Sequence, residues 1–302
     1  MKNKTFEYTP DKTEDFGVIV EHKNYKVSSN YKYIHKNIIF RFFSFIIYYC
    51  IAIPILWTLS KISNRVKIEN KNVVKQLKDT GYFIYSNHTL WLDGFTQHVY
   101  SARPKRTIVI SHPDVFMQNK LLGGFLSYLG AFPLPSDFRS AKNFLKGMEY
   151  YLDKKWCIAI YPEGTIWPYY TGQRPIRKGS FKYPRIFNKP VVFACTTYRK
   201  PKGIFKKFMK PGMTITLSDP VMPARNDIEK NDESRLENLY REFIEKISSS
   251  KENYSAYSYI PKKLDKDYLD FIDEAVAKYP NFDYETSVEN KVIQIKKGKK
   301  SK

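Results

Sequence analysis

Short apolar runs that alternate with helical stretches set the strongest constraint on the fold of this chain. The runs have the length and residue types of strands, and the segments between them have helical periodicity. Strands separated by helices predict an α/β domain with a mostly parallel central sheet flanked by helices. In such domains the active groups lie on loops at the carboxyl ends of strands. The predicted strands are Tyr82–Tyr85, Thr107–Ile110, Cys157–Tyr161, Val191–Thr196 and Met213–Leu217.

Three amphipathic helices stand out from Ser140 onward. The clearest covers Ser140–Asp153, where apolar residues recur at helical spacing and Ser140 suits the N-cap. A second is predicted over Leu236–Ile247 and a third over Leu264–Lys278.

The segment Phe42–Leu59 contains 18 residues and no charge. As a helix it would cover about 27 Å, slightly less than the roughly 30 Å of a bilayer core, and Pro54 would kink it. Three structures fit: a short span, a helical hairpin in one leaflet, or a buried core helix. Cations on both flanks favour insertion into one leaflet with both ends on the cytoplasmic face. These cations are Lys32, Lys36, Arg41, Lys61, Arg65 and Lys67.

The composition narrows the class of protein further. Lys and Arg number 51 against 30 for Asp and Glu, and this net charge of +21 predicts an anionic partner, either nucleic acid or a membrane surface. The 42% apolar content excludes wholesale disorder. Cys50, Cys157 and Cys195 are too scattered for disulfides or zinc and are expected to be small buried residues in a reducing cytosol. No secretory signal is visible.

These features predict five regions along the chain. They are an irregular polar arm (1–30), a membrane-associated helical segment (31–68), the α/β domain (69–225), C-terminal helices packed on it (226–280) and a basic tail (281–302).

His88 and Asp93 follow the first predicted strand. In a continuous helix five residues turn by about 500°, which would keep the two side chains apart. They can meet if His88 lies on the loop and Asp93 in the first helical turn. The carboxylate would then orient the imidazole, which fits a general base for a substrate hydroxyl. The simpler alternative is a helix-capping Asp beside an inactive loop His.

A second group follows the strand Cys157–Tyr161. A Pro-Glu-Gly-Thr turn is followed by several cations, and this combination suits a phosphate site because Gly admits the oxygens and Arg binds them in pairs. The alternative is a surface turn with solvated charges. The candidate residues are Glu163, Gly164, Thr165, Arg174, Arg177 and Lys178. A third segment, Gly130–Arg139, places a cation, Arg139, at a predicted helix start.

Together these motifs resemble the four ordered blocks of the glycerolipid acyltransferases, especially the 1-acyl-glycerol-3-phosphate acyltransferases. The blocks are Asn87-His88 with Asp93, the Gly130–Arg139 segment, Tyr161 to Thr165, and Pro190-Val191-Val192. The likeness covers roughly Gly81 to Leu217.

The resemblance implies a membrane-bound enzyme that transfers a fatty acyl group from acyl-CoA or acyl carrier protein to a lysophospholipid hydroxyl, without metal or cofactor. It implies that His88 is the general base, that Asp93 orients it, and that Glu163, Gly164 and Arg139 help to bind the acceptor phosphate. Ile166 stands where the family usually has Arg, so Arg174, Arg177 or Lys178 would replace that contact. The rival interpretations are an inactive membrane-surface scaffold of the same fold and a basic nucleic-acid binding protein.

Overall fold

The computed structural model describes residues 4–9, 12–17, 25–117, 120–204 and 206–262. The chain forms two compact units, Met1–Phe6 with Asp11–Tyr259, and Glu7–Pro10 with Ile260–Lys302. The predicted helix Leu264–Lys278 and the predicted basic tail 281–302 lie outside the described residues.

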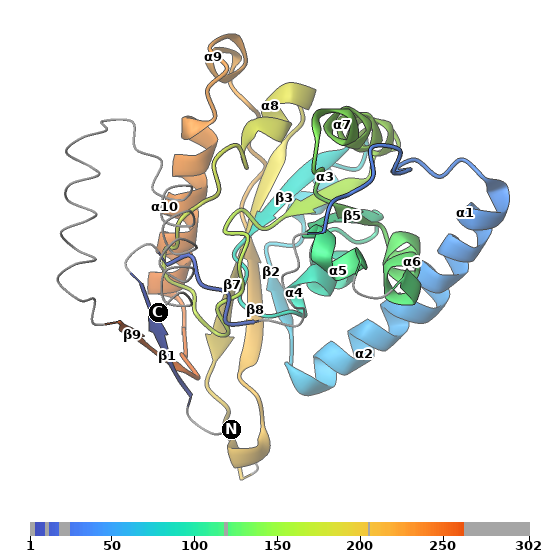
Figure 1. The fold of residues 1–302 in the computed structure, drawn as a ribbon. Helices are drawn as coiled ribbons and strands as arrows, with labels where there is room; N and C mark the ends of the chain where they lie inside the picture. The colour runs from blue at the N-terminus through green and yellow to red at the C-terminus, as the bar shows by residue number, and fades with distance from the viewer. Residues whose placement is uncertain (1–3, 10–11, 18–24, 118–119, 205, 263–302) are drawn as a thin grey trace, which may run out of the picture. The chain divides into compact units, whose positions relative to one another are not determined.

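A seven-stranded sheet in the order β2-β8-β7-β3-β6-β4-β5 forms the centre of the larger unit (Figure 1). Strands β7, β3, β6, β4 and β5 are parallel, whereas β8 runs antiparallel to β7 and carries β2 parallel to itself. This confirms the predicted α/β fold. The strands are β2 (Lys67–Glu69), β3 (Tyr82–Ser86), β4 (Thr107–Ser111), β5 (Ala131–Pro133), β6 (Cys157–Ile160), β7 (Val191–Arg199) and β8 (Gly212–Leu217).

All five predicted strands are present, and β2 and β5 were not predicted. Each of these two contains three residues, which is too short for a pattern of alternation to be recognised. Both pair at the margins of the sheet, so their conformation depends on neighbours distant in sequence.

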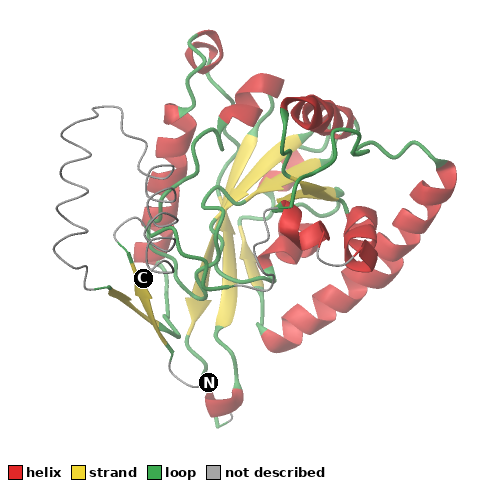
Figure 2. Cartoon of the chain, in the orientation of Figure 1, coloured by secondary structure: helices red, strands yellow, loops and turns green. Residues whose placement is uncertain are grey.

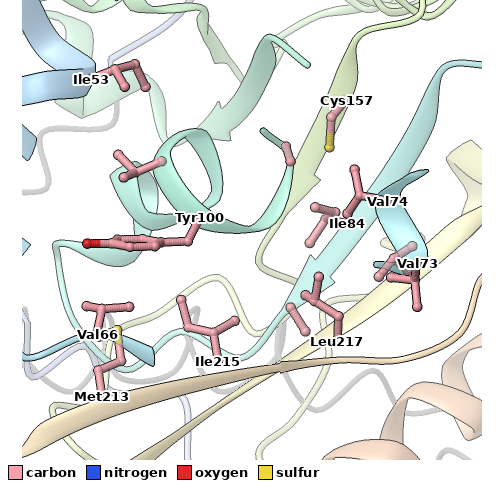
Figure 3. Close-up of a cluster of buried hydrophobic side chains, with 14 of the residues drawn as sticks. Ile53, Val66, Val73, Val74, Ile84, Tyr100, Cys157, Met213, Ile215 and Leu217 are labelled. Carbon is pink, nitrogen blue, oxygen red and sulfur yellow. The ribbon is translucent and has the colours of Figure 1, made fainter. Parts of the chain in front are cut away.

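Helices cover both faces of the sheet (Figure 2). Alternate residues of β3 point to opposite faces, and Ile84 and Phe83 are both fully buried. One face packs against α7 (Phe138–Asp153) and α10 (Ser234–Ser250), and the other packs against α3 (Val73–Gln76) and the apolar N-terminal helix. Figure 3 shows the second cluster. The other helices are α4 (Asp93–Thr96), α5 (Pro113–Met117), α6 (Lys120–Leu129), α8 (Lys182–Phe187), α9 (Arg225–Glu229) and two short segments, η2 (Gln97–Ser101) and η3 (Lys206–Phe208).

The start of α7 differs from the sequence prediction. Asp137, not Ser140, is the N-cap, and the helix begins at Phe138. The Asp137 carboxylate accepts the Ser140 N–H at 2.6 Å, while the Ser140 hydroxyl accepts the Asp137 N–H at 3.0 Å. This reciprocal capping box places Ser140 inside the first turn.

The uncharged segment forms one continuous helix from Ile38 to Ser63, divided into α1 (Ile38–Phe45), a π-helical segment η1 (Ile46–Ala52) and α2 (Ile53–Ser63). Among the described residues it is the helix that is long and apolar enough to cross a membrane. Only 22% of its most apolar window is buried, so the core-helix alternative is wrong, and the helical hairpin is also absent. The wide η1 turns directly precede Pro54, which cannot donate a backbone hydrogen bond.

The buried side of this helix makes polar contacts as well as apolar ones, since Ser44 and Ser60 are buried along with Tyr48, Ala52 and Ile53. The Ser44 hydroxyl donates to the Tyr128 carbonyl at 2.7 Å, and the Ser60 and Tyr100 hydroxyls lie 2.6 Å apart. Phe42 and Ile62 are instead 60% and 74% exposed. The outward side of the helix is therefore also apolar, unlike that of an ordinary surface helix.

Two further expectations need correction. The N-terminal arm is not wholly irregular, because β1 (Thr5–Tyr8) pairs with β9 (Ser258–Pro261) and Val27 is buried. Cys50 is exposed on the outward side of the apolar helix, whereas the other two cysteines are buried as expected.

His98 joins the apolar helix to the domain and makes stability depend on pH. Its Nδ1 lies 3.0 Å from the Tyr48 hydroxyl, and burial, reinforced by the charge of Arg106, lowers the pKa of His98 to about 3. Below its ordinary pKa of 6.5 the unfolded chain binds a proton at His98 that the folded chain excludes. The stability that depends on neutral His98 is therefore complete above this pH and is lost as the pH falls.

From about pH 7.5 to pH 5, we expect the free energy of unfolding to fall by about 2 kcal/mol more in the native protein than in His98→Gln. Denaturant titrations at the two pH values measure this difference. Equal losses in both proteins would contradict the burial of a neutral imidazole.

Candidate active site

His88 lies on the loop that follows the central strand β3. The neighbouring residue, Asn87, ties this loop to β7: its amide donates to the Thr196 carbonyl at 3.1 Å and accepts the Thr196 N–H at 2.8 Å. The His88 side chain is 17% exposed, so one edge of the imidazole is accessible at the carboxyl edge of the sheet.

Asp93 is the first residue of α4, and its carboxylate is buried beneath this loop. Oδ2 accepts the N–H groups of Thr89 at 2.6 Å and Leu90 at 2.8 Å. The same oxygen lies 3.3 Å from Nδ1 of His88. The structure thus brings the predicted pair together in the predicted way, with His88 on the loop and Asp93 in the first helical turn. With Nδ1–H directed at the carboxylate, Nε2 carries the lone pair that can take a proton.

Tyr161 is a site residue that the sequence did not single out for a role. Its ring stacks on the His88 imidazole with 4.3 Å between centroids, and its hydroxyl donates to the backbone carbonyl of Asp93. Burial raises the pKa of Tyr161 well above its ordinary value, so the phenol keeps its proton and remains a donor. Its position at the end of β6, directly before the Pro-Glu-Gly-Thr turn, was the available signal.

Glu163 and Arg174 form a buried ion pair that holds the backbone of His88. Glu163 Oε2 accepts the His88 N–H at 2.9 Å, while Arg174 donates to the His88 carbonyl at 2.8 Å. Arg174 also pairs with Glu163 and donates to Thr165 Oγ1 at 3.0 Å. Burial lowers the pKa of Arg174 to about 10, which leaves it charged at neutral pH. These contacts occupy both groups, so Arg174 is placed as a positioning residue and not as a free phosphate ligand.

Gly164 and Arg177 lie against each other at the same turn. Gly164 has φ +69°, and a Cβ there would overlap the Arg177 side chain. The Arg177 N–H donates to the Pro162 carbonyl at 2.9 Å. Arg177 and Lys178 are both exposed, so their charges remain available at this edge of the sheet.

Arg139 is exposed near the start of α7, which follows β5. Three strand spacings separate β5 from β3 in the sheet order, which corresponds to roughly 14 Å. The structure therefore does not place Arg139 beside His88.

The N-terminal arm is hydrogen-bonded to the loop after Thr165. The Ile166 N–H donates to Asp15 Oδ1 at 3.1 Å, and the Phe16 N–H donates to the Ile166 carbonyl at 2.9 Å. The Trp167 indole donates to the Glu14 carbonyl at 2.6 Å. At the position where the family usually has Arg, this chain therefore has an anchor for its own arm. Among the described residues no group of three or more His, Cys, Asp or Glu could hold a metal ion.

Comparison with known protein families gives a match for part of this chain. The acyltransferase family model matches residues 65–195, a range that contains β2 to β6, the His88 loop and the Glu163 turn. These residues match an acyltransferase domain, and the match supports O-acyltransferase activity. The resemblance to the glycerolipid acyltransferases predicted from the motifs is confirmed at the level of this family.

Among solved structures the chain is similar to the 1-acyl-sn-glycerophosphate (LPA) acyltransferase PlsC from Thermotoga maritima, at 16% sequence identity and a TM-score of 0.49. The match covers 70% of this chain and 88% of that one. No curated protein matches the sequence.

Replacing Arg174 should separate its positioning role from phosphate binding. Arg174→Met leaves Glu163 as an unpaired buried charge, and we expect a loss of about 3–5 kcal/mol in the free energy of unfolding. The exposed Arg177→Met is the matched control and should change stability by no more than about 0.5 kcal/mol. Denaturant unfolding measures both, and equal stability of the two variants would rule out the structural ion pair.

Proposed function

We propose that this acyltransferase transfers a fatty acyl group from acyl-CoA or acyl carrier protein to the hydroxyl of a lysophospholipid, with 1-acyl-glycerol-3-phosphate as the preferred acceptor. The contact between His88 and the buried Asp93 carries the proposal. It directs Nδ1 to the carboxylate and leaves Nε2 of the imidazole free at the carboxyl edge of the sheet.

The chemistry needs one base and no acyl-enzyme intermediate. Nε2 of His88 takes the proton of the acceptor hydroxyl as that oxygen attacks the thioester carbonyl carbon. The C–S bond then breaks, and the departing thiolate receives the proton from the imidazolium, so His88 ends neutral. A positioned general base typically contributes roughly 10²–10⁴ in rate. Asp93 stabilises the imidazolium in between, and Tyr161 and the Glu163–Arg174 pair hold the loop.

The acceptor phosphate is assigned to the exposed cations beside the Glu-Gly-Thr turn. Arg177 can make bidentate contacts to phosphate oxygens, and Lys178 adds a point charge next to it. Gly164 leaves room for the Arg177 side chain, and Thr165 is held by Arg174. Arg139 would contact only an acceptor that extends along the sheet edge towards β5.

His88→Ala should lower kcat by at least about 100-fold, because it removes the base. Thioester release by the purified protein in the presence of 1-acyl-glycerol-3-phosphate measures the rate. The matched control is His112→Ala, which removes another histidine in contact with an aspartate, at 3.5 Å from Asp114. Near-normal turnover of His88→Ala, or loss confined to His112→Ala, would refute the assignment.

The membrane placement is also a proposal, supported by the exposed apolar side of the helix from Ile38 to Ser63. Polar contacts at Ser44 and Ser60 attach the helix to the domain near both of its ends. Ser44 and Ser60 are 16 positions apart, which corresponds to about 24 Å of helix, so the domain accompanies the helix for most of its length. This arrangement favours a helix embedded in the cytoplasmic leaflet over one that crosses the bilayer alone.

A basic hairpin tip, residues 200–204 and 206–211 between β7 and β8, projects from the same edge of the sheet as His88, because β7 is parallel to β3. At this tip Ile204 and Phe208 are 89% and 88% exposed. The end of α2 is tied to its base, where the Met213 N–H donates to the Asn64 carbonyl at 2.7 Å. Apolar side chains among cations suit the interface of an anionic membrane. The cations are Lys200, Lys202, Lys206, Lys207 and Lys210.

The double variant Ile204→Ser with Phe208→Ser should bind phosphatidylglycerol-containing vesicles roughly tenfold more weakly or worse, because two apolar side chains no longer enter the bilayer. Ile186→Ser is the matched control, since Ile186 is 47% exposed on α8 at the amino end of β7. Vesicle sedimentation measures the binding. Equal binding of both variants would remove the hairpin tip from the membrane surface.

A further inference from the structure

A cavity of about 760 Å³ lies at the opposite edge of the sheet from His88. Its lining includes Arg106, Gly130 and Trp156, which directly precede β4, β5 and β6. The five steps from Trp156 to Tyr161 span roughly 16 Å along the extended strand, so this cavity is separate from the catalytic edge. Its volume is within the range of small-molecule sites, roughly 300–1,000 Å³.

The lining is cationic. It contains Lys32, Arg41, Arg106 and Lys154 together with His35, and no Asp or Glu is among the lining residues. Lys32, Arg41 and Lys154 are exposed at its rim. Such a concentration of one sign of charge at a concave site attracts anions.

Arg106 is the cation at the inner wall of the cavity. Its guanidinium lies between the rings of Tyr48 and Trp156, at 4.5 and 4.8 Å from their centroids. It donates to the Tyr128 carbonyl at 2.7 Å, yet its Nε is buried without a hydrogen-bond partner. Within the described part of the chain no carboxylate lies at ion-pair distance from Arg106. Burial lowers the pKa of Arg106, as expected for a charge without a counter-ion.

The rest of the lining is apolar and continuous with the outward side of α1. Tyr33 and Phe132 form a buried aromatic wall, and their ring centroids are 5.1 Å apart. Ile38, Phe42 and Phe45 line the other side from α1 and are 78%, 60% and 54% exposed. A ligand that fits must combine an anionic group with apolar chains.

We propose that this cavity binds an anionic phospholipid of the surrounding membrane, with its phosphate among Arg106, Lys32 and Lys154 and its chains along α1. The site is distinct from that of the acyl acceptor, and its access from the bilayer rests on the proposed membrane placement of the apolar helix. The lipid lies between the helix and the sheet and stabilises their contact.

Native mass spectrometry of the full-length His88→Ala protein tests the site without acyl transfer. The probes are phosphatidylglycerol, phosphatidylcholine with the same chains, and inorganic phosphate. We expect one tightly held phosphatidylglycerol per chain, weaker retention of phosphatidylcholine, and no displacement by phosphate. Lys32→Glu with Lys154→Glu should lower phosphatidylglycerol occupancy roughly tenfold or more, because two attractive charges become repulsive. These side chains are exposed, so the variant is expected to fold.

The matched control is Lys142→Glu with Lys146→Glu, which reverses two exposed charges of α7 outside the cavity lining. Unchanged occupancy in the cavity variant, or equal loss in the control, would overturn the proposed site. Displacement by inorganic phosphate would overturn the lipid as its occupant. Lipid binding is measured on the inactive His88→Ala protein. Absence of bound lipid would therefore not contradict the proposed acyl transfer, and absence of acyl transfer by the native protein would not contradict lipid binding.

Discussion

A single buried carboxylate oxygen organises the catalytic loop. Oδ2 of Asp93 accepts two backbone N–H groups of the loop and faces Nδ1 of His88. A buried carboxylate raises the free energy of the folded state unless hydrogen bonds satisfy it. A loop that moved away from Asp93 would break these hydrogen bonds and leave the charge buried without partners. The interaction that stabilises the loop is therefore also the one that orients the imidazole.

The backbone of His88 is held from the neighbouring strand as well. Its N–H donates to Glu163 and its carbonyl accepts from Arg174, so one ion pair on the loop after β6 fixes both polar groups of the residue. The charges of the pair neutralise each other away from water, which keeps Arg174 from the substrate. Arg177 and Lys178 remain exposed nearby, which is why the proposed function gives them, and not the buried pair, the acceptor phosphate.

The apolar helix combines polar anchors on its buried side with an apolar exposed side. Its hydrogen bonds to the domain are shielded from water, and its outward residues gain free energy only if another apolar phase covers them. The hairpin tip between β7 and β8 brings further exposed apolar side chains, among cations, to the catalytic edge. A charge of +21 on the whole chain gives an anionic bilayer the complementary sign.

The sequence by itself determined the α/β class, the strands from β3 to β8 except β5, and the candidate pair His88 and Asp93. These features depend on local apolar periodicity and on residue types placed directly after strands, which short stretches of sequence contain. Tertiary structure decided which cations are buried, that Ser44 and Ser60 of the apolar helix face the domain, and that Tyr161 covers the imidazole. It also created the cationic cavity from segments around Lys32, Arg106 and Trp156. Burial and pairing depend on residues that lie far apart along the chain, and a local sequence pattern does not determine which of these residues come into contact.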